Sequence, residues 1–189
     1  MTASPAEPSL DLDAAVVVAL GSNVAGGYTS SKALLEAALE SLQAAGLKIA
    51  RRSRWWRSAA WPDPNGPEYR NGAALFRTDG DPQRTLETLL CIEAGFNRER
   101  GERNAPRTLD LDLIAHGRSV LHTPGLVLPH PRAHERLFVM GPLAEIAPDW
   151  RHPEGGESAA ELMSALPRRP GVRKISSRPR GSSARRPGS

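Results

Sequence analysis

Two aspartates on a short strand are the residues of this chain best suited to metal chemistry. The segment from Leu109 to Leu113 alternates strictly, with leucine at each odd position and Asp110 and Asp112 between them. In an extended strand this pattern places the leucines on one face and both carboxylates on the other, with about 6.5–7 Å between their Cα atoms. Adjacent carboxylates repel one another, and a hard divalent cation such as Mg²⁺ relieves that repulsion.

Arginines gather just before this strand. Four of them fall within ten residues, at Arg98, Arg100, Arg103 and Arg107, and Glu99 and Glu102 neutralise only some of their charge. A planar guanidinium pairs well with phosphate, so aspartates and arginines together indicate phosphoryl-type chemistry. Plainer interpretations stay open, because a bare Asp-x-Asp is more often a solvated strand face and an arginine-rich loop can simply be hydrated.

The surrounding sequence predicts the elements that would hold these side chains. Apolar and β-branched runs predict strands at 14–20, 48–58, 71–78 and 109–115, with a further short strand around Val120. Leucine spacing predicts a helix over 31–45, and Asp81-Pro82 begins a second helix that ends near Gly95. Irregular segments are expected at 58–70, 98–106 and 126–131, followed by a partial helix over 132–146 that is interrupted at Gly141-Pro142.

The order strand–helix–strand–strand–helix–strand predicts an α+β fold. We expect a ferredoxin-like split βαβ sandwich, with an antiparallel sheet and helices packed on it. The length of 189 residues suits one domain, and a hydrophobic share of 39% is enough for a core.

Charge is distributed unevenly along the chain. Residues 168–189 hold eight of the 25 basic residues and no acidic one, so 17 basic and 21 acidic residues remain in 1–167. The net charge of +4 therefore reflects the C-terminus, and the rest of the chain is mildly acidic. We expect a disordered leader over 1–13, a folded domain over 14–167 and a disordered basic tail over 168–189.

Cysteine content and hydropathy limit the cellular context. The single Cys91 excludes an intramolecular disulfide and indicates a reducing compartment, and its apolar helical surroundings predict that its thiol is buried. The chain has no apolar run of about 18 residues, and its N-terminus lacks the features of a secretory signal. We therefore expect no membrane partner, a cytoplasmic location and a monomer.

Several segments resemble the 6-hydroxymethyl-7,8-dihydropterin pyrophosphokinase family. The most specific are Pro106-Arg107-Thr108-Leu109-Asp110-Leu111-Asp112 and Leu128-Pro129-His130-Pro131. The others, in the same order along the chain, lie at 19–23, 67–71, 92–93 with Arg98 and Arg100, 136–139 and 142–148. Together the segments span most of 15–165.

The resemblance implies an ATP-dependent diphosphotransferase of folate biosynthesis. Such an enzyme moves pyrophosphate from ATP to 6-hydroxymethyl-7,8-dihydropterin, which gives AMP and the pterin diphosphate. It implies two Mg²⁺ ions held by Asp110 and Asp112, with Arg98 and Arg107 as catalytic arginines. The ATP-binding residues it implies are Glu93, Arg100, Leu113, His130 and Arg136. The pterin-binding residues it implies are Ser58, Ala59, Trp61, Tyr69, Asn71 and Phe138.

Some of these residues have ordinary structural interpretations without the resemblance. His130 between prolines is typical of a turn, Asn71 of a strand start and Phe138 of a core. Two rival functions also remain, namely another metal-dependent phosphotransferase or nuclease, and a nucleic-acid-binding module driven by the tail. Because no aromatic residue interleaves with the basic residues of 168–189, nucleic acid is not an expected partner, and deleting the tail should leave catalysis nearly intact.

Overall fold

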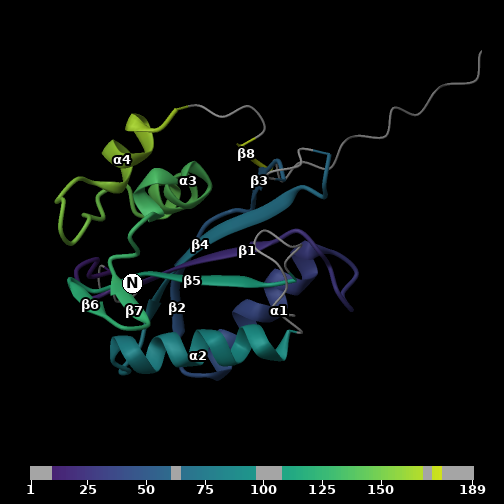
Figure 1. Ribbon diagram of the computed structural model, residues 1–189, viewed down its shortest axis with the longest axis horizontal. Helices are drawn as coiled ribbons and strands as arrows, with labels where there is room; N and C mark the ends of the chain where they lie inside the picture. Colours follow the sequence, from purple (N-terminus) through teal and green to yellow (C-terminus); the bar gives the residue numbers. More distant parts are fainter. Residues whose placement is uncertain (1–9, 61–64, 97–107, 168–171, 176–189) are drawn as a thin grey trace, which may run out of the picture.

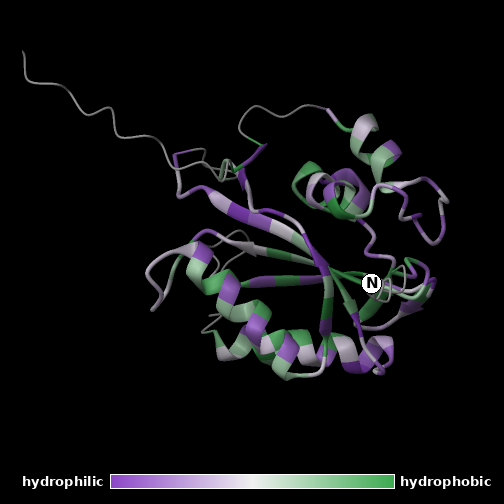
Figure 2. Ribbon diagram, turned by 180° about the vertical axis from the view of Figure 1, so that it is seen from behind, coloured by the Kyte–Doolittle hydropathy of each residue, from purple (hydrophilic) through white to green (hydrophobic). Residues whose placement is uncertain are grey.

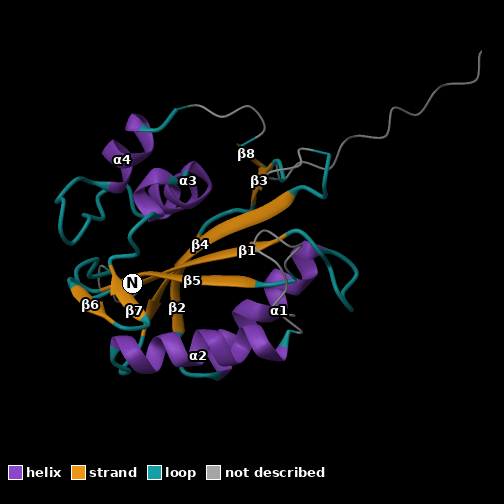
Figure 3. Ribbon diagram, in the orientation of Figure 1, coloured by secondary structure: helices purple, strands orange, loops and turns teal. Residues whose placement is uncertain are grey.

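A twisted antiparallel sheet forms the centre of the molecule (Figures 1 and 3). The computed structural model describes residues 10–60, 65–96, 108–167 and 172–175. In this part of the chain the main sheet has six strands in the order β5-β1-β4-β3-β8, and β2 also pairs with β4. The strands are β1 (Val16–Ser22), β2 (Lys48–Arg52), β3 (Trp56–Ser58), β4 (Tyr69–Arg77), β5 (Asp110–His116) and β8 (Arg173–Lys174).

Helices cover both faces of this sheet (Figure 1). One face carries α1 (Ser31–Ala44) and α2 (Pro82–Gly95). The other carries α3 (Leu137–Ile146), which follows a 3-10 turn at Ala133–Glu135, and α4 (Ala159–Ala165), which packs on α3. The predicted α+β sandwich is confirmed. Within the described residues, no helix combines the length and apolar character that crossing a membrane requires.

The helix starts follow from local sequence. Ser30 caps α1, its Oγ accepting the Ala33 N–H at 3.1 Å, and Asp81 caps α2, its Oδ1 accepting the Arg84 N–H at 2.8 Å. A side-chain oxygen at this position satisfies one of the N–H groups that the first helical turn leaves unpaired. Both predicted helices are therefore confirmed close to their expected first residues.

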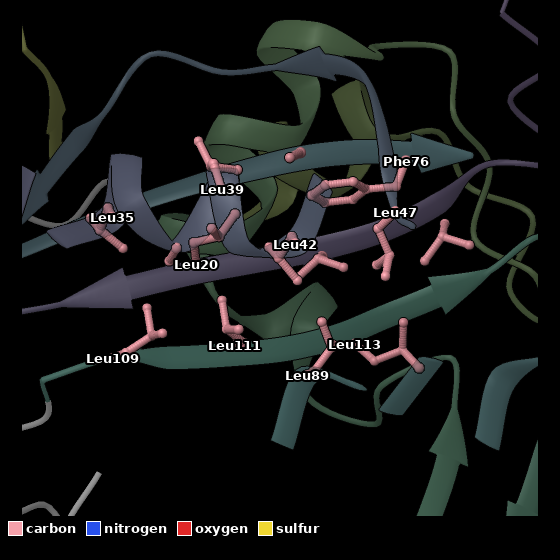
Figure 4. Close-up of a cluster of buried hydrophobic side chains, with 14 of the residues drawn as sticks. Leu20, Leu35, Leu39, Leu42, Leu47, Phe76, Leu89, Leu109, Leu111 and Leu113 are labelled. Atoms are coloured by element: carbon pink, nitrogen blue, oxygen red, sulfur yellow. The ribbon is translucent and has the colours of Figure 1, made fainter. Parts of the chain in front are cut away.

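The core has two layers because β1 is buried on both faces. Val16, Val18 and Leu20 face α1 and α2, where they join the leucines of α1 and β5 (Figure 4). Val17 and Ala19 face the opposite way and pack with α3. The strands of the sheet and the helices α1 and α2 all carry both hydrophobic and hydrophilic residues (Figure 2). A strand covered on both sides needs an apolar run rather than alternation.

The short strand expected around Val120 is confirmed, whereas one predicted strand is divided and one predicted connection contains a strand. The strand expected over 48–58 divides at Ser53, whose Oγ accepts the Ala73 N–H at 3.0 Å and so takes the place of a backbone carbonyl. The strand expected around Val120 is β6 (Leu121–Thr123). It forms a hairpin with β7 (Leu126–Leu128), part of the expected connection, through a turn in which Gly125 has φ of 91°.

Two further corrections concern helices. The chain does not break at Gly141-Pro142, because α3 continues through Pro142. Proline removes one helical hydrogen bond, but Met140 and Leu143 on the same helix are completely buried, and their packing outweighs that loss. Cys91 is exposed rather than buried. The buried side chains of α2 are spaced four residues apart, at Thr85, Leu89 and Glu93, and Cys91 lies between them on the opposite side.

Candidate functional site

A row of side chains crosses four strands on the sheet face that α3 covers. Trp56 on β3 pairs with Asn71 on β4, Asn71 with Gly21 on β1, and Gly21 with Asp110 on β5. Directly paired residues of antiparallel strands project from the same face. Asn71 and Asp110, separated by 39 positions in sequence, therefore lie on either side of a residue that has no side chain.

Gly21 keeps the centre of this row open. A Cβ at this position would lie 3.4 Å from Asn71 Oδ1 and 3.7 Å from Asp110 Cβ. Any larger side chain would occupy the space between the amide and the carboxylate. The place of Gly21 in this row depends on strand register, which no local sequence pattern contains.

The two aspartates project from the face of β5 opposite its leucines, as the alternation predicted. Leu109, Leu111 and Leu113 are buried in the core beneath α1 and α2 (Figure 4), while Asp112 is paired with Ala19 on the α3 face. Asp112 Oδ2 lies 3.6 Å from Arg136 Nη1, and each side chain is 30% exposed. Asp112 is thus open to a ligand and is held near a cation from the segment that precedes α3.

The donor set is suited to magnesium in a nucleotide site. Among the described residues, no group of three or more His, Cys, Asp or Glu side chains is arranged to hold a metal ion. Mg²⁺ rarely uses such an all-protein cage, since it binds one or two carboxylates and takes its other oxygens from water and substrate phosphates. Asp110 and Asp112 provide that pair.

Hydrogen bonds to the outer edge of β5 hold two more segments beside the aspartates. Because β5 ends the sheet, its outward backbone groups need partners from outside it. Glu93 of α2, only 2% exposed, accepts the Leu111 N–H with an Oε1–N distance of 2.6 Å. The Ile114 carbonyl accepts the His130 N–H at 2.8 Å. Backbone groups next to Asp110 and Asp112 therefore anchor both α2 and the segment that carries His130.

The surroundings of His130 favour its neutral form. Burial lowers the pKa of His130 below its usual value; the negative charge of Asp112 opposes this, while Arg136 adds to it. Its Nδ1 accepts the Arg132 N–H at 3.2 Å, so the hydrogen of the neutral ring belongs on Nε2. His130 lies in the turn that its flanking prolines predict, and that turn fixes the orientation of its ring.

Asn71 lies beside other predicted pterin residues on β3 and β4. Asn71 Nδ2 donates to Ser58 Oγ at 2.9 Å, and the two side chains are 6% and 7% exposed. Tyr69 pairs with Ser58 across β3 and β4, and Ala59 follows directly on the chain. From α3, the Phe138 ring is half-buried and lies with its centroid 5.9 Å from Arg136 Cζ. Arg136 therefore connects the Phe138 ring to Asp112.

Two predicted ATP-binding residues lie elsewhere. Leu113 is 5% exposed and packs in the core, because the same alternation that exposes the aspartates turns it inward. Glu93 is enclosed behind β5, where its carboxylate binds backbone. The predicted residues Arg98, Arg100, Arg107 and Trp61 lie outside the described residues, as do Arg103 and the whole irregular segment expected over 98–106.

Glu93 is expected to act on the site through the position of β5. Replacing Glu93 with alanine removes the acceptor of the buried Leu111 N–H and should lower the free energy of unfolding by about 2–3 kcal/mol. Chemical denaturation of both proteins measures this difference. The control is Glu87→Ala on the exposed face of α2, where the expected change is within about 0.5 kcal/mol. Equal losses in the two variants would contradict the role given to Glu93.

Comparison with known proteins adds independent information. Residues 17–148 match the family model described as 7,8-dihydro-6-hydroxymethylpterin-pyrophosphokinase (HPPK). A Synechocystis protein named 2-amino-4-hydroxy-6-hydroxymethyldihydropteridine pyrophosphokinase is 43% identical over 151 residues, which cover 79% of this chain and 75% of that one. A Methylorubrum extorquens protein of the same name is 38% identical over 148 residues, covering 78% and 90%.

A solved structure supports the fold. The chain superposes on a Plasmodium falciparum HPPK-DHPS structure with pteroate at a TM-score of 0.63 and 12% sequence identity. The match covers 79% of this chain and 44% of that one, so this chain corresponds to less than half of the Plasmodium protein. At such low identity the likeness concerns architecture.

Proposed function

The chain belongs to the 7,8-dihydro-6-hydroxymethylpterin-pyrophosphokinase family, whose members transfer pyrophosphate from ATP to hydroxymethyldihydropterin in folate biosynthesis, and we propose that the row around Gly21 is where this reaction takes place here. The observation that carries the proposal is the register that sets an amide, Asn71, and a carboxylate, Asp110, on either side of that glycine. An amide suits a heterocycle edge, and a carboxylate suits a metal-bound phosphate.

Asp110 and Asp112 would hold Mg²⁺ on the α3 face of β5. When bound, the ion would neutralise phosphate charge and orient the phosphate oxygens. Arg136, 3.6 Å from Asp112, supplies a fixed positive charge next to these carboxylates. Two ions, as the resemblance implies, would share the same two carboxylates.

We assign pterin binding to the Asn71 side of the row. The Asn71 amide is fixed by its bond to Ser58 and carries both donor and acceptor atoms, which suits the edge of a pterin. Phe138 offers a ring against which a flat heterocycle can pack. Since Asn71 and Asp110 flank Gly21, the hydroxymethyl group of a pterin bound at Asn71 would point along the row toward the metal-bound phosphates.

We assign ATP to the Asp112 side. His130 and Arg136 supply a neutral N–H donor and a cation beside Asp112, a pair that suits phosphate oxygens. Arg98, Arg100 and Arg107, outside the described residues, are proposed to add positive charge that offsets charge on the transferring phosphates. Glu93 and Leu113 would support this side from the core.

AMP release tests the function directly. The purified protein with Mg²⁺ and ATP is expected to form AMP and pterin diphosphate only when 6-hydroxymethyl-7,8-dihydropterin is present. AMP formation that does not depend on the pterin would indicate a different phosphotransferase or a nuclease. Absence of AMP with both substrates, from a protein whose folding is verified by circular dichroism, would refute the proposal.

The cellular setting and the domain limits are also proposals. A cytoplasmic location rests on the single cysteine and on ATP as substrate, and a monomer rests on the family resemblance. We propose a folded domain over 14–167; residues 1–9 of the expected leader and most of the expected tail over 168–189 lie outside the described residues. One described strand, β8, lies in the C-terminal range that composition assigns to the tail, and it pairs with β3.

A further inference from the structure

The C-terminal strand β8 extends the functional row by one more residue. Lys174 pairs with Trp56, and the Ile175 N–H donates to the Trp55 carbonyl at 3.0 Å. The row across the sheet therefore reads Lys174, Trp56, Asn71, Gly21, Asp110. β8 lies beyond residue 148, where the match to the family model ends. The family match thus leaves one end of this row unassigned.

Glu145 of α3 contacts three side chains at this end of the row. Its carboxylate accepts from Arg54 Nε at 2.7 Å and from Trp56 Nε1 at 3.0 Å, and it lies 3.5 Å from Lys174 Nζ. Glu145 is only 13% exposed; burial raises its pKa, but hydrogen bonds from Arg54 and Trp56 bring the pKa below the usual value. One ionised carboxylate therefore joins α3, β3, the segment before β3 and β8.

Lys174 also contacts the Trp56 ring. Its Nζ lies 5.5 Å from the ring centroid, within the range of a cation–π interaction. The Trp56 ring also packs closely against α3. A Cβ built on Gly141 of this helix would lie 2.6 Å from Trp56 Cζ3. Trp56, 7% exposed, is therefore fixed between a helix and the lysine of β8.

The elements that carry Glu145 and Trp56, α3 and β3, also carry residues of the proposed pterin site. Phe138, Gly141 and Glu145 are three and four residues apart and share one face of α3. Ser58, which binds the Asn71 amide, is two residues from Trp56 on the three-residue strand β3. A shift of β3 would move Ser58 against Asn71, and a shift of α3 would move Phe138.

We infer that Lys174, with Glu145 and Trp56, is a positioning residue for the pterin-binding half of the site. β3 is held by three register pairs on β4, and β8 supplies its pairing on the other side. Loss of the Lys174 charge removes its side-chain contacts with Glu145 and the Trp56 ring and leaves the backbone pairing of β8 with β3. The effect should fall on pterin binding, because Asp112, Arg136 and His130 take no part in these contacts. This inference rests on the function proposed above.

Steady-state kinetics of full-length Lys174→Met test the inference. The methionine keeps the length of the side chain and removes its charge. We expect the KM for the pterin to rise about three- to tenfold, with the KM for ATP and kcat within about twofold. Lys174→Arg should restore most of the pterin KM. The matched control is Lys48→Met, an exposed lysine at the start of β2, which should leave all three constants unchanged.

Two further measurements separate this inference from the proposed function. Hydrogen exchange of the β3 amides should become faster in Lys174→Met, whether or not the protein turns over a pterin. Combining Lys174→Met with Glu145→Gln should raise the pterin KM by less than the product of the single effects, because the two residues act together. Unchanged β3 exchange, or equal changes in the KM values of both substrates, would overturn the positioning role. Lack of turnover by the wild-type protein would count against the function alone.

Discussion

Turnover by Asp112→Asn is expected to fall by a factor of about a thousand or more at saturating Mg²⁺, ATP and pterin. Asparagine keeps the shape of the side chain but removes the negative charge that would hold the ion beside Arg136. A bound metal stabilises transition-state charge by several kcal/mol, and about 4 kcal/mol corresponds to a thousandfold in rate. Quenched-flow or coupled measurement of AMP formation gives the value.

The folding of this variant should be nearly unaffected. Asp112 is 30% exposed, and partly exposed replacements usually change stability by little, so the unfolding midpoint should move by about 2 °C or less. Asp149→Asn, an exposed aspartate in the loop after α3, serves as the matched control and should retain full turnover. A near-normal rate for Asp112→Asn would rule out its metal role, and so would a comparable loss in Asp149→Asn.

The second large effect is expected for Asn71→Ala, with kcat/KM for the pterin about a hundredfold lower. A site built to hydrogen-bond a polar heterocycle leaves buried polar groups unpaired when the matching amide is lost. The KM for ATP should change little, because Asp112, His130 and Arg136 belong to the side of the site assigned to ATP, whereas the Asn71 amide binds Ser58 on β3. Initial rates measured over a matrix of both substrate concentrations separate the two effects.

Ser58→Ala distinguishes recognition by Asn71 from its support. It removes the oxygen that fixes the Asn71 amide at 2.9 Å but keeps the amide itself. We expect a loss in kcat/KM of about three- to tenfold, in line with one hydrogen bond of roughly 1 kcal/mol. If Asn71→Ala costs no more than Ser58→Ala, the amide is not a direct contact of the pterin.

Local patterns predicted a large part of the fold. Leucine spacing predicted α1, and Asp81-Pro82 predicted the start of α2, because helix patterns depend on residues only a few positions apart. The alternation in 109–113 gave the face of each aspartate, since a strand repeats every two residues. Patterns failed where packing overrode them: α3 continues through Pro142, and Cys91 lies on the exposed side of α2.

The sequence alone determined the chemistry available to this protein: the carboxylate pair, the arginines and the strand and helix order that resemble a pyrophosphokinase. Only the tertiary structure decided how those groups are combined. Packing of α2 placed the Glu93 carboxylate against the backbone of β5. Antiparallel register placed Asn71 and Asp110 on either side of Gly21. It also brought Lys174 to the end of the same row. Such relations join residues tens of positions apart, and they arise from backbone hydrogen bonds between strands, which leave no periodic signal in either strand alone.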